Sequence, residues 1–128
     1  IDALPRLIKE KGVGFLMQKE IEWLNKVLNG FESPYVVVLG GSKVSDKIGV
    51  LDALVEKADI FIIGGAMAYT FLAAQKHSTG ISKVEKDRVT YAKEFMRKLE
   101  ARNKSILLPV DHYVVNRFDN PVDPQYIE

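Results

Sequence analysis

Three short apolar runs along the chain are typical of strands that are buried on both faces. Two of them occupy residues 35–39 and 60–63, and a third begins at residues 106–108. Their apolar residues follow one another directly, without the alternation of apolar and polar side chains that a half-exposed strand shows. Such runs are characteristic of parallel sheets, in which both faces are covered. We therefore predict three strands of one parallel sheet.

Before and between these runs, apolar residues recur at the spacing of an α-helix. The pattern predicts helices over residues 18–29, 44–57, 66–75 and 84–102, with a weaker helical period over residues 1–11. Strands that alternate with helices favour an α/β fold with right-handed crossovers. Beyond Asn116 the pattern fails, and we predict a loop up to the end of the chain. Because three strands make a small sheet, we interpret the chain as an incomplete α/β layer.

The composition is that of a globular domain and excludes several kinds of chemistry. Of the 128 residues, 47% are hydrophobic and 27% are charged. There is no cysteine, so disulfides, thiol catalysis and cysteine-bound metals are excluded. With 18 basic and 17 acidic residues, the net charge of +1 provides no field to attract nucleic acid or anionic lipid. No apolar run is long enough to span a membrane and no secretory signal is visible, so we expect a cytoplasmic protein with neither a membrane nor a nucleic-acid partner. Since the chain opens on Ile1, we expect a fragment.

A pair of glycines follows each of the first two predicted strands. Gly40 and Gly41 end the first strand, and Gly64 and Gly65 end the second, so both turns should lie at the carboxyl edge of the sheet, where open α/β sheets bind ligands. Glycine allows positive φ and lets a ligand approach the backbone. The helix after each turn should direct free N–H groups at the same position, which favours phosphate. A glycine pair after a strand can equally be only a tight turn.

Two lysines follow the first glycine pair, at the start of a predicted helix. Lys43 and Lys47 are four residues apart, which would place them on one face of the first helical turn. Two neighbouring ammonium groups repel each other unless they share an anion, and a polyphosphate would satisfy both. Alternatively, Asp46 could neutralise them on an ordinary surface helix. The spacing alone leaves both interpretations open.

The glycine turns match neither of the common nucleotide-binding signatures. Residues 40–48 contain neither the GxxxxGK[ST] pattern of a P-loop nor the GxGxxG pattern of dinucleotide-binding domains. Gly64 stands where a dinucleotide site usually has an acidic residue, so NAD binding is disfavoured. His77 and His112 have no partners at metal-ligand spacing, and we expect them to have surface or local hydrogen-bonding roles. Asp111 could bind a metal or a hydroxyl group, or could simply stabilise a turn.

Four segments of the chain carry a family pattern. They are FLMQKE at residues 15–20, GGSKVSDKI at 40–48, IIGGAMAYTFL at 62–72 and LPVD at 108–111. In this order they resemble the phosphoglycerate kinase family. The resemblance extends over nearly the whole chain, which corresponds to only about a third of the family's two-domain protein.

The resemblance implies a Rossmann-like three-layer parallel sheet, incomplete in this chain. Residues 1–128 would be part of the C-terminal, nucleotide-binding domain, and residues 1–30 would be a helical approach from the interdomain region. The N-terminal substrate domain would be absent.

The family's reaction is reversible phosphoryl transfer in glycolysis, between 1,3-bisphosphoglycerate and Mg-ADP, giving 3-phosphoglycerate and ATP. By resemblance, Lys43 would meet the transferring phosphoryl group and Lys47 would hold the nucleotide phosphates, both as catalytic residues. Gly41 and Ser42 would flank the adenosine, and residues 64–66 would form the opposite wall. The implied nucleotide-binding residues are Gly40, Gly41, Ser42, Lys43, Lys47, Gly64, Gly65 and Ala66. Mg²⁺ would be held through the nucleotide, with its protein ligand outside this chain, and the parent protein would be a monomer.

Two positions depart from the family's pattern. Ala66 replaces a third glycine that many members have, and Lys83 stands where an apolar residue near the adenine is expected. The family's later glycine-rich phosphate loop, with the aspartate there that binds Mg²⁺, is also absent. We therefore expect the isolated chain to be inactive. The alternative is a non-catalytic α/β nucleotide-binding or interaction module on the same scaffold. A flavodoxin-like or dinucleotide-binding domain is disfavoured by the missing fingerprint.

Overall fold

The computed structural model describes residues 6–29, 32–117, 119 and 121–127, which divide into two compact units, Ile1–Ser33 and Pro34–Glu128. The first unit contains helix α2 (Phe15–Asn29), which begins before the predicted residue 18. Residues 6 and 7 are helical but residues 8–14 are not. The weak helical period predicted over residues 1–11 is therefore wrong beyond residue 7, and residues 1–5 lie outside the described part.

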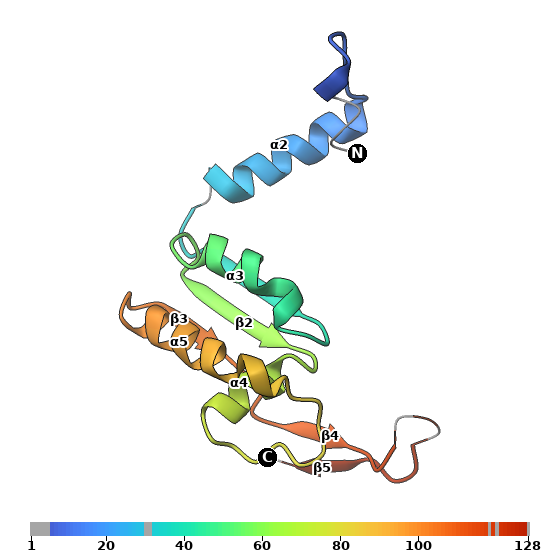
Figure 1. Cartoon of the computed structure of the whole chain (residues 1–128), viewed down its shortest axis with the longest axis vertical. Coiled ribbons are helices and arrows are strands. Elements are labelled where there is room, and N and C mark those ends of the chain that lie inside the picture. Colours follow the sequence, from blue (N-terminus) through green and yellow to red (C-terminus); the bar gives the residue numbers. More distant parts are fainter. Residues whose placement is uncertain (1–5, 30–31, 118, 120, 128) are drawn as a thin grey trace. The chain divides into compact units, whose positions relative to one another are not determined.

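A parallel sheet of three strands forms the centre of the second unit (Figure 1). The strands are β1 (Val36–Gly40), β2 (Ile60–Gly64) and β3 (Ser105–Leu107), in the order β1-β2-β3. Val36 pairs with Ile60 at one end of the first ladder, and Gly40 pairs with Gly64 at the other. The predicted α/β fold with a parallel sheet is confirmed, because each apolar run forms the expected strand to within about one residue.

The helices between the strands are shorter than their apolar patterns predicted. Helix α3 (Ile48–Leu54) is preceded by the 3₁₀ turn η1 (Ser45–Lys47), and helix α5 (Val89–Glu100) is preceded by the 3₁₀ turn η2 (Lys86–Arg88). Helix α4 comprises Ala68–Ala74. The prediction of one helix over residues 84–102 is wrong at its start, where Glu85 has an extended backbone with φ of −83° and ψ of 90°.

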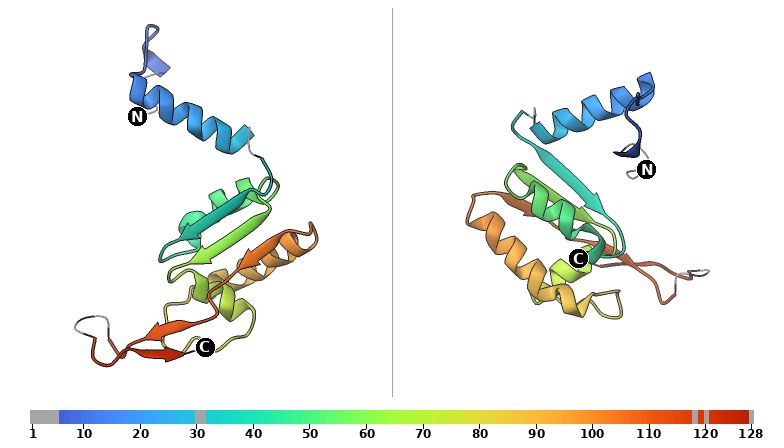
Figure 2. Two further views of the ribbon diagram at one scale, coloured as in Figure 1. Left: turned by 180° about the vertical axis from the view of Figure 1, so that it is seen from behind. Right: turned by 45° about the horizontal axis from the view of Figure 1, so that its top comes forward.

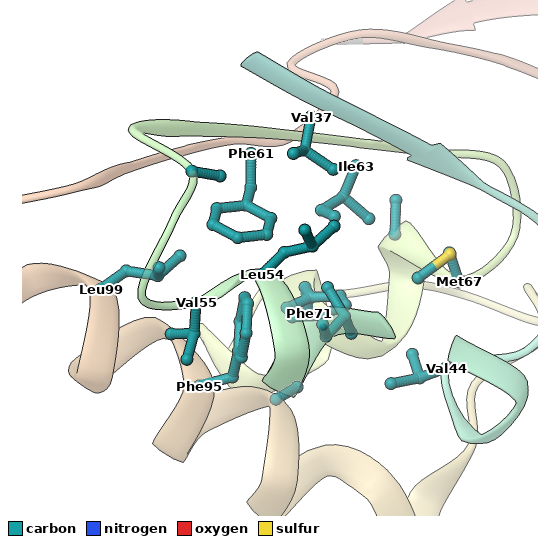
Figure 3. Close-up of a cluster of buried hydrophobic side chains, with 14 residues drawn as sticks. Val37, Val44, Leu54, Val55, Phe61, Ile63, Met67, Phe71, Phe95 and Leu99 are labelled. Carbon is teal, nitrogen blue, oxygen red and sulfur yellow. The ribbon is translucent and has the colours of Figure 1, made fainter. Parts of the chain in front are cut away.

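One face of the sheet carries the hydrophobic core, and α3, α4 and α5 cover it (Figures 2 and 3). From the sheet, Val37, Phe61 and Ile63 point into this core. The helices contribute Leu51 and Leu54 from α3, Ala68 and Phe71 from α4, and Ala92, Phe95 and Leu99 from α5. The ring of Phe95 meets the ring of Phe61 edge to face, with centroids 5.3 Å apart.

The opposite face of the sheet is apolar and exposed. It presents Val36, Val38, Ile62 and Leu107, and the side chain of Val38 is 72% exposed. The described helices of this unit all lie on the other face, so helices cover the sheet on one side only. The sheet of only three strands agrees with the incomplete α/β layer that the sequence predicted.

A second, two-stranded sheet was not predicted. Strands β4 (His112–Val114) and β5 (Gln125–Ile127) pair antiparallel, with Tyr113 opposite Tyr126. The prediction of a loop from residue 117 to the end of the chain is therefore wrong at β5. Each strand has only three residues, too few to show a period. A cross-strand contact joins them, in which the two tyrosine rings lie 5.6 Å apart.

Candidate functional site

The two glycine turns lie side by side at the carboxyl edge of the parallel sheet, as predicted. The N–H of Met67, just after the second turn, donates a hydrogen bond of 2.9 Å to the carbonyl oxygen of Gly41 in the first turn. Gly65 has a φ of +66°, and a Cβ added to it would lie 2.8 Å from the Gly41 oxygen and 2.9 Å from the Gly41 nitrogen. Only glycine fits this approach without displacing the neighbouring backbone. The absence of a side chain at Gly65 therefore allows the second turn to pack closely on the first.

The loop that carries both candidate lysines is held by the valine between them. The side chain of Val44 is fully buried, in the same core cluster as Met67 (Figure 3). Lys43 lies in the loop before η1 and is exposed, whereas Lys47 ends η1 and is half-buried. The prediction that both lysines lie on one α-helical face is wrong, because the α-helix begins only at Ile48. They flank a buried anchor instead.

The prediction of free N–H groups after the first glycine turn is wrong at the start of η1, because a carboxylate binds them. Glu85 accepts hydrogen bonds from the Val44 N–H and, at 3.2 Å, from the Ser45 N–H. The Ser45 hydroxyl donates to the other carboxylate oxygen of Glu85 at 2.6 Å. Glu85 is itself held by its own N–H, which donates to the hydroxyl of Thr70 at 3.2 Å. An incoming phosphate would therefore meet the lysine side chains and the glycine turns and not these N–H groups.

Glu85 is held in its charged form by this environment. Partial burial opposes its ionisation, but the hydrogen bonds from Ser45 and Val44, helped by the charge of Lys43, lower the pKa of the Glu85 carboxyl below its ordinary 4.5. A carboxylate on the N–H groups of a helical turn also interacts favourably with the positive end of that turn. The lysine loop, residues 43–47, is therefore held against a negative charge that comes from another part of the chain.

The remaining predicted site residues flank this region. Gly40 and Gly41 are exposed and Gly64 is half-buried, while the exposed Ser42 precedes Lys43 and the half-buried Ala66 follows Gly65. The structure thus brings the two glycine turns together and holds the lysine loop through Glu85. The sequence pattern offered no sign of Glu85, which is 40 residues from Ser45 along the chain.

Other polar residues singled out in the sequence have local partners. The hydroxyl of Tyr69 lies 3.4 Å from Nδ1 of His112, as expected for a local hydrogen-bonding role, and His77 is exposed. Asp111 accepts a hydrogen bond of 3.1 Å from the hydroxyl of Tyr126. Among the residues that the structure describes, no group of three or more His, Cys, Asp or Glu side chains could hold a metal ion.

Comparison with known proteins identifies the scaffold. A family model described as phosphoglycerate kinase matches residues 1–127 of the chain. The chain belongs to the phosphoglycerate kinase family. The phosphoglycerate kinase of Bdellovibrio bacteriovorus is 56% identical over 112 residues, which are 88% of this chain and 28% of that protein. The phosphoglycerate kinase of Anaeromyxobacter sp. strain Fw109-5 is 53% identical over 110 residues, or 86% of this chain and 28% of that protein.

Solved phosphoglycerate kinase structures have the same fold. That from Coxiella burnetii superposes with a TM-score of 0.84 at 38% identity, over 89% of this chain and 29% of that one. That from Pyrococcus horikoshii gives a TM-score of 0.74 at 32% identity, over 90% and 29% of the two chains. The chain therefore spans less than a third of the relatives it matches. Among its described residues, no helix is long and apolar enough to cross a lipid bilayer.

Proposed function

We propose that this chain carries part of the ADP/ATP site of a glycolytic phosphoglycerate kinase. The parent protein would transfer a phosphoryl group reversibly between 1,3-bisphosphoglycerate and Mg-ADP, giving 3-phosphoglycerate and ATP. The match of the family model over residues 1–127 is the observation that carries this proposal. The chain's position in the parent, as part of the C-terminal domain with residues 1–30 leading to it, belongs to the same proposal, as do a monomeric state and a cytoplasmic location.

In this proposal the lysine loop binds the phosphoryl groups and the glycine turns line the adenosine. Phosphoryl transfer requires mainly that the reacting groups be positioned and that negative charge be stabilised. The side chain of Lys43 is exposed, whereas that of the following Val44 is buried. Lys43 is therefore accessible to a ligand at the edge of the sheet and would meet the transferring phosphoryl group. Lys47 would hold the nucleotide phosphates. The backbone of residues 40–42 and of 64–66 would line the two sides of the adenosine.

Magnesium would enter as part of the substrate, Mg-ADP. The described residues supply no cluster of acidic side chains for it, so this chain does not fit an independent metal site. The protein ligand of the ion would lie in a part of the kinase that this chain does not span. This chain's own residues would supply the positive charge of Lys43 and Lys47 and the glycine turns, whose backbone a ligand can approach closely.

Lysine substitutions in the full-length protein that contains this segment test the proposed roles. We expect Lys43→Ala to lower kcat about 100-fold with little change in the KM for ADP, because its charge would act mainly in the transition state. We expect Lys47→Ala to raise the KM for ADP about tenfold, since it would bind the ground state as well. Lys93→Ala, on the exposed surface of α5, removes the same charge and is the control. If all three variants have wild-type kinetics, the lysine loop is not the phosphate site.

The isolated chain should not catalyse the reaction. It would lack the acceptor site and the later phosphate loop that complete the pocket in the parent. Turnover by the purified chain in a coupled assay, abolished by Lys47→Ala, would contradict this. If the full-length protein itself transfers no phosphoryl group, the alternative of a non-catalytic nucleotide-binding or interaction module on this scaffold is favoured.

A further inference from the structure

The shape of the lysine loop depends on one side chain from another part of the chain. Between the end of β1 and the start of η1, residues 41–44 belong to no helix or strand. Three contacts fix them: the buried side chain of Val44, the hydrogen bond from Met67 to Gly41, and the carboxylate of Glu85. Only the last contact reaches the backbone between the two lysines, at Val44 and Ser45.

Glu85 links the segments that follow the two glycine turns, so the position of one segment depends on that of the other. Its N–H is anchored on the hydroxyl of Thr70, which is 1% exposed in α4, the helix that follows the second glycine turn. Its carboxylate is anchored on the loop that follows the first glycine turn. A single residue therefore ties the start of η1 to α4. Hydrogen bonds to an ionised carboxylate are stronger than those between neutral groups, so this tie is a firm one.

The carboxylate also acts on the neighbouring charges. Its negative charge attracts Lys43, which precedes the first N–H that it binds. By occupying the Val44 and Ser45 N–H groups, it leaves an incoming anion to the side chains of Lys43 and Lys47. The tie thus fixes the backbone between the two lysines and directs the anion toward their ammonium groups.

We propose that Glu85 is a positioning residue for phosphoryl transfer, which holds the 43–47 loop so that Lys43 and Lys47 both face the nucleotide phosphates. This role rests on the proposed kinase function. Glu85 touches neither substrate nor reacting atoms; it acts through the loop. Loss of its hydrogen bonds should therefore change nucleotide kinetics and not the binding of 1,3-bisphosphoglycerate, the phosphoglycerate substrate in the direction that consumes ADP.

The test uses the full-length protein with a graded set of variants at this contact. Glu85→Ala removes the tie, and Glu85→Gln keeps an oxygen that can accept from the two N–H groups. Glu85→Asp keeps the charge but shortens its reach, while Ser45→Ala removes only the hydroxyl bond. Glu94→Ala removes an exposed carboxylate from α5 and is the matched control. For each variant, kcat and the KM values for ADP and for the phosphoglycerate substrate are measured, with the melting temperature alongside.

We expect Glu85→Ala to lower kcat/KM for ADP about tenfold to hundredfold, because the loop loses charge-assisted hydrogen bonds and the geometry that they fix. The KM for the phosphoglycerate substrate should stay within about twofold of wild type, and Glu85→Gln should recover most of the loss. Ser45→Ala should cost only about twofold to fivefold, as it leaves both backbone bonds intact. Glu94→Ala should match wild type.

The possible outcomes distinguish failure of the positioning role of Glu85 from failure of the kinase function on which that role rests. A wild-type protein without phosphoryl transfer refutes the kinase function and the role of Glu85 with it. An active wild type whose Glu85→Ala variant differs only in melting temperature refutes the positioning role alone, because a purely structural residue leaves the kinetics of the folded enzyme unchanged. If Glu85→Ala does not fold, unchanged nucleotide kinetics in Glu85→Asp overturn the proposal, and a loss in Glu85→Asp that Glu85→Gln does not share supports it.

Discussion

The contact between the two glycine turns makes Gly65, among the glycines that the structure describes, the one least able to accept a side chain. The substitution Gly65→Ala adds one methyl group at a φ of +66°, where it would lie 2.8 Å from the oxygen and 2.9 Å from the nitrogen of Gly41. Both neighbours are backbone atoms, which cannot rotate away as a side chain could. Relief requires that one turn move relative to the other.

The free energy of unfolding should fall by about 2–5 kcal/mol. The left-handed backbone costs an alanine roughly 1–2 kcal/mol relative to glycine. Overpacking against atoms that must shift adds about 1–3 kcal/mol. Because the shift separates Gly41 from Gly65, the variant should also raise the KM for ADP if both turns line the nucleotide.

Gly64→Ala is the matched control for this measurement. A Cβ at Gly64 has no heavy atom within 4 Å, so we expect a change below about 1 kcal/mol from the altered backbone entropy. Urea denaturation of both full-length variants, followed by circular dichroism, compares the two. If Gly65→Ala and Gly64→Ala differ by less than about 0.5 kcal/mol, the turns do not pack as described and the reasoning is wrong.

Three further predictions concern the core and the polar contacts. Phe95→Ala should lower the free energy of unfolding by about 3–5 kcal/mol in the same urea assay, because the 1% exposed ring leaves a cavity beside Phe61; a loss below about 1 kcal/mol would contradict the packing. The hydroxyl of Tyr91 donates a hydrogen bond of 3.1 Å to Asp52. Burial of the phenol is the larger cause, and the neighbouring Asp52 carboxylate the smaller one, that raises the pKa of Tyr91 above its ordinary range. Tyr91→Phe should therefore cost about 1 kcal/mol and remove one tyrosine that ionises above the ordinary pKa of 10 from an absorbance titration with alkali, and an unchanged titration in that range would refute this. Since the pKa of Glu85 is lowered on folding, its stabilisation is fully present above the ordinary 4.5 and is lost as the pH falls through the lower folded value. The stability difference between wild type and Glu85→Gln should accordingly shrink on acidification below 4.5, whereas a constant difference would show that ionisation of Glu85 contributes nothing.

The parallel sheet could be predicted from the sequence because its strands are continuous apolar runs. Residues 35–39 and 60–63 are such runs, and the glycine pairs that follow them lie at one edge of the sheet, as the pattern of turns predicts. The short strands β4 and β5 could not be predicted, since three residues carry no period and the partner of Tyr113 lies thirteen residues away in a segment with two prolines.

The detail of the candidate site was less accessible than the fold. The spacing of Lys43 and Lys47 suggested a shared helical face, but it could not show that Glu85 would bind the N–H groups at that point and that a 3₁₀ turn would replace the first α-helical turn. An acidic residue just before an amphipathic helix is indistinguishable from an ordinary surface residue in the sequence. The role of Gly65 was also unforeseen, because the pattern indicates a turn without showing what the turn contacts.

If the lysine loop binds the nucleotide as proposed, the way in which Glu85, Val44 and the second turn hold this loop would determine the thermodynamics of ligand binding. A loop that is ordered before the ligand arrives loses its conformational entropy when the protein folds and not when the nucleotide binds. Each ordered backbone residue would otherwise cost about 1–2 kcal/mol of binding free energy, and five residues, 43–47, are concerned. Calorimetry of Mg-ADP binding to the full-length protein should then show little heat-capacity change from ordering of this loop, and Glu85→Ala should transfer that ordering, with its unfavourable entropy, to the binding step.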